Sequence, residues 1–318
     1  MTPETPLVVI RCATYNQAAY IRQCLDGFVM QRTDFAFVAI VHDDCSTDGT
    51  DDIVREYAQR YPNIIKPIFE TENQYSKGDG SLSRIMNQAC NNTGAKYMAM
   101  CEGDDYWNDP LKLQKQVDFL ENHPEYELVF TNRNILKNGE IKPSYHPMRE
   151  YSSIDILSGF IPGFQTLLLK RDNEKRALIS KYNGKINGDI LIPYIYSTFH
   201  PIYCLPDITA TYRYSGYGVH SSLKKQQLFE TSIRHFFIFH EQFNFPANNV
   251  LYRLHARFLF EYCWSDLYQL NTKSLISGVK YIHNIYKDSP CKSLKILPNF
   301  IHVLCKQVFG IIKYKIRR

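Results

Sequence analysis

The stretch YMAMCEGDDYWNDP (residues 97–110) sets an apolar run directly against three carboxylates. Residues 97–101 have the length and composition of a buried strand. Glu102, Asp104 and Asp105 follow at once. Crowding like charges at the end of a buried strand is costly unless water or a cation compensates them. The stretch therefore predicts either an ordinary solvated loop or a cation site at the mouth of a strand.

Strand-like and helix-like stretches alternate around this segment. The strand-like runs are LVVIRCA, FAFVAIVHDD, NIIKPIF and KYMAMC. The stretches with apolar residues at helical spacing are AAYIRQCLDGFVMQ, TDDIVREYAQRY, SLSRIMNQACNN and PLKLQKQVDFLENH. Such alternation with short links is typical of an α/β protein with a doubly wound, mainly parallel sheet. In such sheets ligands bind beyond the carboxyl ends of the strands.

Polar clusters fall at those strand ends. TYN follows the first strand, DDCSTDGT the second and EGDD the fourth. Tyr15 offers a ring on which a nucleotide base can stack, and Asp44 offers an acceptor for the imide N–H of uracil. Asp48, Gly49 and Thr50 are better explained as a capped turn before a helix.

Mg²⁺ and Mn²⁺ prefer carboxylate oxygens, with phosphate oxygens and water completing the shell. Gly103 allows Glu102 and Asp104 to turn toward one point, while Asp105 supplies a third oxygen or contacts a ribose hydroxyl. The alternative is that water alone solvates this loop. We expect Mn²⁺ or Mg²⁺ as the cofactor, because the acidic loop lies on the same rim as DDCSTDGT.

The 318 residues have ordinary globular composition, with 44% hydrophobic and 22% charged residues. The middle of the chain is less regular, with strand-like GFQTLLLKR and PDITATYRY and helix-like DILIPYIYSTF. From Lys224 onward the pattern is helical. We expect a first domain over residues 1–222, with a donor half to about 130 and an acceptor half over 131–222. A helical C-terminal region follows over residues 223–318.

A net charge of +5 is too mild to indicate a nucleic-acid partner. The nine cysteines include no C-x-x-C pair, which favours reduced thiols and excludes a recognisable zinc motif. The first ten residues lack the pattern of a secretory signal, and no uncharged apolar run is long enough to span a bilayer. We expect a cytoplasmic protein.

The C-terminal segment LPNFIHVLCKQVFGIIKYKIRR combines an apolar stripe with basic residues. This pattern predicts peripheral contact with an anionic membrane, on the inner face of the plasma membrane. The alternative is that the stripe packs on the preceding helices of the protein. The pattern alone does not separate the two.

Four segments in order and spacing resemble family 2 glycosyltransferases of the GT-A fold. They are VVIRCATYNQAAYIRQCLDGFVMQ, DDCSTDGT, GSLSRIMNQA and EGDDYWNDPLKLQKQ. The resemblance covers about the first 130 residues. It implies inverting transfer of a sugar from a nucleotide-diphosphate donor, with a UDP-sugar expected, to a hydroxyl of a saccharide or a lipid-linked saccharide. The family-level setting is assembly of cell-surface polysaccharide or lipopolysaccharide.

The resemblance also implies roles for individual residues. Donor binding falls to Ala13, Tyr15, Asp44, Arg84, Asp104, Arg213 and His220. Metal binding falls to Glu102, Asp104 and Asp105. The family more often has Asp where this chain has Glu102. The usual Y-R-x-H segment is altered as well, since Ser215 follows Arg213–Tyr214 and His220 lies near the usual histidine position but not at it.

Displacement at the anomeric carbon needs a base to take the proton of the acceptor hydroxyl. The family places an acidic residue at the start of a helix after an irregular stretch. NGKINGDILIPYIY matches that context and makes Asp189 the candidate base. The alternative is that Asp189 simply caps the helix.

Two other functional classes compete with a glycosyltransferase. A nucleotidyltransferase or dehydrogenase on a similar sheet would want a Gly-rich first loop, whereas CATYNQAAY contains no glycine. A non-catalytic carbohydrate-binding protein could retain the fold. Intact carboxylates at Asp44, Asp104, Asp105 and Asp189 argue against it.

Overall fold

The computed structural model describes residues 5–157, 160–182 and 186–214. The chain divides into two units, Met1–Gly216 and Tyr217–Arg318, and the described residues all belong to the first. The predictions for His220, for the helical C-terminal region and for its basic tail lie outside the described residues.

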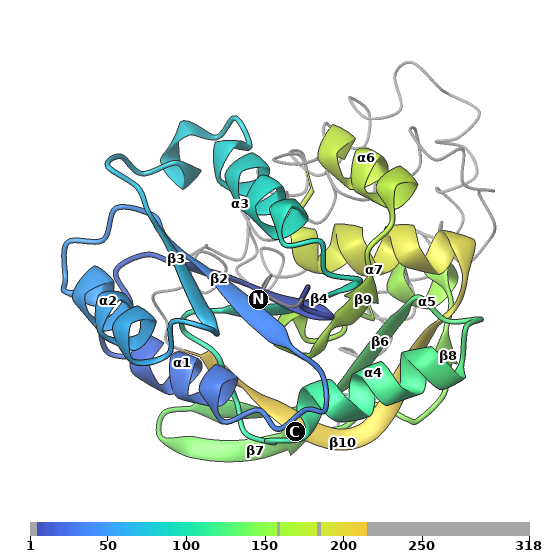
Figure 1. The fold of residues 1–318 in the computed structure, drawn as a ribbon. Coiled ribbons are helices and arrows are strands. Elements are labelled where there is room, and N and C mark those ends of the chain that lie inside the picture. Colours follow the sequence, from blue (N-terminus) through green and yellow to red (C-terminus); the bar gives the residue numbers. More distant parts are fainter. Residues whose placement is uncertain (1–4, 158–159, 183–185, 215–318) are drawn as a thin grey trace, which may run out of the picture. The chain divides into compact units, whose positions relative to one another are not determined.

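One curled sheet organises the described part (Figure 1). Its strands are β1 (Val8–Thr14), β2 (Phe37–Asp43), β3 (Ile65–Phe69), β4 (Tyr97–Glu102), β5 (Tyr106–Trp107), β6 (Leu128–Lys137), β7 (Glu140–Ser144), β8 (Glu150–Tyr151), β9 (Leu168–Lys170) and β10 (Ile202–Tyr214). They follow the order β3-β2-β1-β4-β9-β6-β10-β5, with β7 beside β6 and β8 beside β10. Strands β1 to β4 are mutually parallel, as β6 and β10 are, whereas β9 runs antiparallel between β4 and β6.

Helices cover both faces of this sheet. They are α1 (Ile21–Val29), α2 (Thr50–Arg60), α3 (Ser81–Asn92), α4 (Lys112–Asn122), α5 (Ser153–Leu157), α6 (Asn173–Tyr182) and α7 (Gly188–Phe199), with 3₁₀ turns η1 (Tyr75–Lys77) and η2 (Phe164–Thr166). Figure 1 shows α1, α2 and α4 on one side of the sheet and α3, α6 and α7 on the other. The predicted α/β class with a mainly parallel sheet is confirmed.

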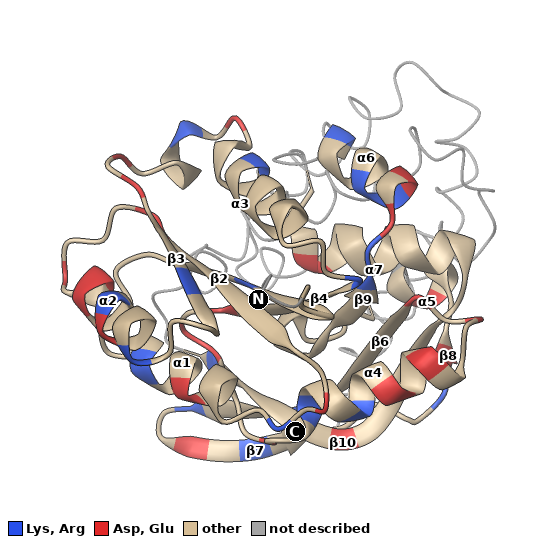
Figure 2. Cartoon of the chain, viewed as in Figure 1, with Lys and Arg blue, Asp and Glu red and all other residues tan. Residues whose placement is uncertain are grey.

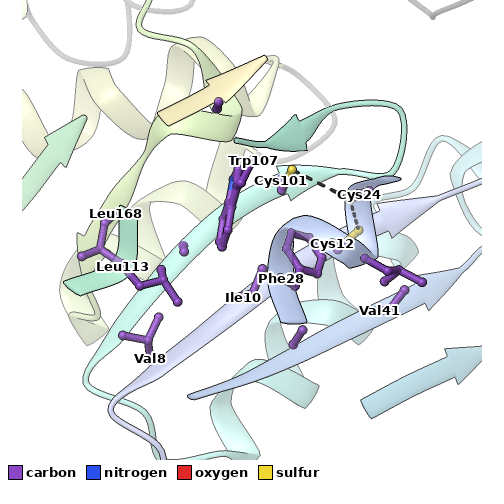
Figure 3. Packing of buried hydrophobic residues seen from close by; sticks show 14 of the residues in the cluster. Val8, Ile10, Cys12, Cys24, Phe28, Val41, Cys101, Trp107, Leu113 and Leu168 are labelled. Atoms are coloured by element: carbon purple, nitrogen blue, oxygen red, sulfur yellow. Dashed lines mark hydrogen bonds between the residues drawn. The ribbon is translucent and has the colours of Figure 1, made fainter. Parts of the chain in front are cut away.

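The core beneath α1 and α4 follows from strand alternation, because residues of one strand point to opposite faces in turn. Ile10 and Cys12 of β1 pack against Phe28 of α1 and against Trp107 (Figure 3). The Phe28 and Trp107 rings meet edge to face at 4.9 Å. This packing holds β1 and β4 side by side, with their carboxyl ends at one rim.

Three buried thiols lie in the same core. The sulfur of Cys24 is 4.0 Å from the sulfurs of both Cys12 and Cys101 (Figure 3). Burial raises the pKa of Cys24 and raises the pKa of Cys101 to about 11, which keeps the thiols of Cys24 and Cys101 protonated and unreactive. They serve as small apolar side chains.

Charged residues of both signs are interspersed on α2, α4 and α6 (Figure 2). Helix α7 differs, because Asp189 is its only charged residue. No helix among the described ranges combines the length and apolar character needed to cross a bilayer.

Candidate active site

The acidic loop (residues 102–105) is anchored on the end of β1. The backbone N–H of Gly103 donates a hydrogen bond to the carbonyl oxygen of Ala13 at 2.9 Å. A Cβ atom at position 103 would meet the amide oxygen of Gln17 and lie 2.7 Å from Thr14 Oγ1. Because Thr14 is fixed in the sheet, this approach requires glycine. The loop carboxylates therefore start from the joint carboxyl ends of β1 and β4.

Asp105 is buried and turned toward β10. Its Oδ1 accepts a hydrogen bond from the backbone N–H of Arg213 at 2.8 Å. Burial, with the negative charge of Asp104 added, raises the pKa of Asp105 well above its usual range. The predicted contact with a metal or a ribose hydroxyl stays a prediction, since the contact seen is with the backbone of a distant strand.

Arg213 lies directly beside the acidic loop. Its Nε donates to the carbonyl oxygen of Asp104 at 2.9 Å, and its Nη2 donates to Gln23 Oε1 at 2.7 Å. The guanidinium also lies over the ring of Tyr20, 4.7 Å from its centroid. Arg213 therefore brings positive charge to the place where the sequence predicts the diphosphate, although its contribution to donor binding stays a prediction.

Glu102 and Asp104 experience an environment that disfavours negative charge. The side chain of Glu102 is exposed, whereas Gly103 and Asp105 beside it are buried. Desolvation, with the charges of Asp104 and Asp189 added, raises the pKa of Glu102 to about 7. Desolvation also raises the pKa of Asp104, against the opposing charge of Arg213. A bound cation would reverse both shifts, because an opposite charge favours the ionised carboxylate.

No three acidic, histidine or cysteine side chains gather closely enough to hold a metal ion within residues 5–157, 160–182 and 186–214. The predicted trio of Glu102, Asp104 and Asp105 is thus not assembled into one cage. Glu102 and Asp104 still suit a divalent metal, because such ions in phosphate-binding sites use one or two carboxylates together with phosphate oxygens.

Asp189 approaches the acidic loop from α7. Asn187 occupies the N-cap position of α7, and Asp189 lies in the first turn. Asp189 is therefore not the N-cap residue, contrary to the alternative that the sequence left open. A carboxylate in the first turn is still favoured by the helix dipole. The negative charge of Asp189 acts on Glu102 and on Arg133. The candidate base is therefore within electrostatic range of the candidate metal ligand.

Asp44 is buried at the end of β2, where both of its oxygens are engaged. Oδ1 accepts the backbone N–H of Gln74 at 2.7 Å, and Oδ2 accepts that of Tyr75 at 3.0 Å. Asp44 therefore fixes the loop after β3. The predicted hydrogen bond to a uracil imide would have to use the remaining lone pairs, and it stays a prediction.

Tyr15 is 48% exposed and stands on a well-anchored loop. Asn16, with a positive φ of 50°, accepts the backbone N–H of Thr47 and donates its own N–H to Ser46. The exposed ring is thereby available on the rim, as stacking on a base would require.

The turn after β2 has the structure that its sequence predicts. Asp48 Oδ1 accepts hydrogen bonds from the backbone N–H and the hydroxyl of Thr50, and Oδ2 accepts the N–H of Ala18. Gly49 has a φ of 90°, a left-handed conformation that glycine adopts without strain. The tight turn is confirmed, whereas the N-cap of α2 is Gly49 and makes no side-chain capping bond, so Asp48 stabilises the turn through Thr50 without occupying the cap position.

Arg84 lies at the start of α3 and folds back on its own helix. Its guanidinium donates to the carbonyl oxygen of Asp79 at 2.7 Å and to Ser81 Oγ at 2.8 Å, and the side chain is exposed. A role for Arg84 at the diphosphate stays a prediction.

Two residues near the site were missed by sequence reasoning. Arg133 lies in β6, and the fully buried Lys112 opens α4, where its Nζ donates to Gln116 Oε1 at 2.6 Å. Burial lowers the pKa of Lys112 to about 7. Nothing in their local sequence marks either residue, because their surroundings come from distant strands and turns.

Comparison with protein families finds that residues 10–183 match the model described as Glycosyl transferase family 2. Among curated proteins, an uncharacterised protein of Mycobacterium tuberculosis is 42% identical over 147 residues, which cover 45% of this chain and 41% of that protein. The chain thus spans less than half the length of these mycobacterial relatives. TuaG of Bacillus subtilis, named as a teichuronic acid biosynthesis glycosyltransferase, is 27% identical over 192 residues, covering 60% of this chain and 71% of TuaG.

Among solved structures, Staphylococcus aureus TarS in complex with UDP-GlcNAc aligns with a TM-score of 0.64 at 19% identity, covering 95% of this chain and 92% of that one. The mannosyltransferase PcManGT of Pyrobaculum calidifontis, in complex with GDP-Man and Mn²⁺, aligns with a TM-score of 0.55 at 15% identity, covering 96% and 88%. At these identities the likeness supports the fold.

Proposed function

Since the chain belongs to glycosyl transferase family 2, we propose that it is an inverting glycosyltransferase. It transfers a sugar from a nucleoside-diphosphate donor, a UDP-sugar, to a hydroxyl of a saccharide or a lipid-linked saccharide. One observation carries this proposal: the family match over residues 10–183 includes the acidic loop, which Gly103 anchors on the end of β1. Glu102 and Asp104 of that loop are the candidate metal ligands, and Asp189 in the first turn of α7 is the candidate base.

Each side of the rim has its own task in this proposal. Tyr15 stacks on the base, and Asp44 keeps the neighbouring loop in place for it. Asp189 takes the proton of the acceptor hydroxyl as that oxygen bonds to the anomeric carbon. Arg213 places positive charge beside the acidic loop. A divalent metal held by Glu102 and Asp104 would neutralise the departing diphosphate.

Two solved structures and the acidic loop support the choice of UDP and of a divalent metal. TarS was solved with UDP-GlcNAc, and PcManGT was solved with GDP-Man and Mn²⁺. Desolvation raises the pKa of Glu102 and of Asp104, and a nearby cation would favour the ionised form of both.

Assembly of a cell-surface polysaccharide is the setting that we propose for this reaction. TuaG, which matches 60% of the chain, is named for teichuronic acid biosynthesis. Lipopolysaccharide assembly and peripheral contact with an anionic membrane belong to the same proposal. The lipopolysaccharide setting rests on the family, and the membrane contact rests on the sequence of the C-terminal segment, which lies outside the described residues.

Thermal unfolding with added ligands tests the proposed donor and metal. UDP together with Mn²⁺ should raise the Tm of the protein, while either alone should do little, because the metal joins the carboxylates to the diphosphate. Equal stabilisation by NAD would favour a dinucleotide-binding enzyme instead. A rise in Tm with neutral sugars alone would favour a carbohydrate-binding protein without catalysis.

A further inference from the structure

The side chain of Arg133 extends from β6 and passes close to Gly163, where the Cβ of any other residue would collide with it. A Cβ atom at Gly163, just before η2, would lie 2.8 Å from both Cδ and Nη1 of Arg133. On another side the guanidinium faces the ring of Tyr212 in β10, 5.3 Å from its centroid. The side chain of Arg133 is therefore held between η2 and β10.

The guanidinium of Arg133 has no hydrogen bond or ion pair among the described residues. Its Nε is buried without a hydrogen-bond partner among the described residues. The charges of Asp105 and Asp189 act on it only through space. A largely desolvated cation without a paired anion is costly to fold. An arginine kept under those conditions retains unpaired N–H donors and is suited to binding an anionic ligand.

Gln165 adds a second donor at the same place. The side chain is 1% exposed, and its Nε2 is buried without a hydrogen-bond partner. Its Oε1 would be 3.2 Å from a Cβ atom on Gly163, the same point that Arg133 Nη1 approaches to 2.8 Å. Gln165 Oε1 and Arg133 Nη1 thus both border Gly163, and within the described residues neither Arg133 Nε nor Gln165 Nε2 has a hydrogen-bond acceptor.

These donors lie on the side of the site that carries Asp189. A Cβ atom on Gly188, the first residue of α7, would be 4.0 Å from the Phe164 ring, so the start of α7 borders η2. Strand β6 is separated from β1, β2 and β3 by β4 and β9. Arg133 is therefore remote from the loops of Tyr15 and Asp44 along the sheet and adjacent to the candidate base.

We propose that Arg133 and Gln165 form a subsite for a carboxylate or a phosphate carried by the sugar substrate that meets Asp189. This inference rests on the proposed function. The planar fork of a guanidinium pairs with two oxygens of such a group at once, which a neutral hydroxyl does not reproduce. The charged group belongs either to the acceptor or to the transferred sugar.

Two calorimetric titrations distinguish the acceptor from the transferred sugar as the source of the charged group. For the acceptor, wild-type protein loaded with UDP and Mn²⁺ is titrated with glucuronate, glucose 6-phosphate or glucose. For the transferred sugar, the protein is titrated with UDP-glucuronate or UDP-glucose. In one of these two titrations the charged sugar should bind about tenfold more tightly than the neutral sugar, because a hydrogen bond to a charged group contributes at least a tenfold gain in affinity. Arg133→Gln should remove the difference, and Arg133→Lys should retain only part of it.

Arg149→Gln is the matched control, because Arg149 is an exposed arginine that pairs with Asp155 away from the acidic loop. It should keep the preference for the charged probe. Should Arg133→Gln fail to fold, Gln165→Glu serves instead, because a carboxylate beside Arg133 should abolish the same preference. The absence of any preference in the wild type, or its survival in Arg133→Gln, would overturn the subsite. Failure of UDP with Mn²⁺ to bind would count against the proposed function, and the charged sugars would still test the subsite.

Discussion

Asp105 accepts a hydrogen bond from the backbone N–H of Arg213, a residue 108 positions further along the chain, at 2.8 Å. The bond joins the acidic loop after β4 to the last described strand, β10. Arg213 returns the connection through its side chain, which donates to the carbonyl oxygen of Asp104. The acidic loop is therefore shaped by the second half of the fold as much as by β4, and this link can be tested by substitution.

Asp105→Ala should destabilise the protein by about 1–3 kcal/mol, because the partly buried N–H of Arg213 loses its acceptor. Asp105→Asn should cost less, since an amide oxygen can still accept that bond and the crowded charge is removed. Urea unfolding measures both. Asp52→Ala, on the exposed face of α2, is the control and should change stability by no more than about 0.5 kcal/mol. Equal losses for Asp105→Ala and Asp105→Asn would mean that the charge, not the hydrogen bond, matters.

Replacement of Asp44 by asparagine (Asp44→Asn), unlike that of Asp105, should be costly to stability. Both oxygens of Asp44 accept backbone N–H groups, from Gln74 and Tyr75, so an amide must turn its NH₂ toward one of these donors. We expect a loss of about 1–3 kcal/mol in the free energy of unfolding and weaker UDP binding, because the loop after β3 loses an anchor. A variant as stable as the wild type would show that the loop does not depend on this carboxylate.

Gly103→Ala should disrupt the acidic loop, because the added Cβ would lie 2.7 Å from Thr14 Oγ1 and 2.8 Å from Thr14 Cβ. The overpacking should cost about 1–3 kcal/mol and should weaken the joint binding of UDP and Mn²⁺. Gly139→Ala, where a Cβ meets nothing within 4 Å but φ is +81°, separates backbone strain from crowding. It should lower stability without changing ligand binding. Unaltered binding in Gly103→Ala would contradict the placement of the loop in the site.

The pKa of Glu102, raised from its ordinary 4.5 to about 7, makes stability depend on pH. Between those values the folded protein holds a proton that the unfolded chain has released, so stability falls as pH rises across this window. Glu102→Gln should therefore be more stable than the wild type above pH 7, and the difference should vanish toward pH 4.5. Unfolding in urea at several pH values measures this, with the exposed Glu140→Gln as control. A difference that does not vary with pH would exclude the raised pKa as its cause.

Much of the first half of the fold could be predicted from sequence. Strand and helix runs as far as α4 follow from apolar spacing, and the turn at Asp48, Gly49 and Thr50 follows from local hydrogen bonding. The hairpin of β6 and β7 was missed, although Asn138 and Gly139, with φ values of 53° and 81°, form the kind of two-residue turn that an Asn-Gly pair signals.

The remaining features of the site depend on contacts between distant segments. The segment DDCSTDGT does not reveal that both oxygens of Asp44 accept hydrogen bonds from the loop after β3, because Gln74 and Tyr75 are remote in sequence. The position of the Arg133 guanidinium depends likewise on the absence of a side chain at Gly163. Sequence patterns identified the acidic residues of the rim, but not which of them are already bound to the protein.

The most direct measurement compares turnover and nucleotide binding in Asp189→Asn and Asp104→Asn. Release of UDP from an accepted UDP-sugar gives kcat, and calorimetry gives the Kd for UDP in the presence of Mn²⁺. We predict that Asp189→Asn lowers kcat by about 10²–10⁴-fold and leaves the Kd unchanged, whereas Asp104→Asn impairs both. If Asp189→Asn keeps its turnover and its free energy of unfolding falls only by the roughly 0.3–1 kcal/mol that a charge at a helix terminus contributes, Asp189 is not the base and the account is wrong.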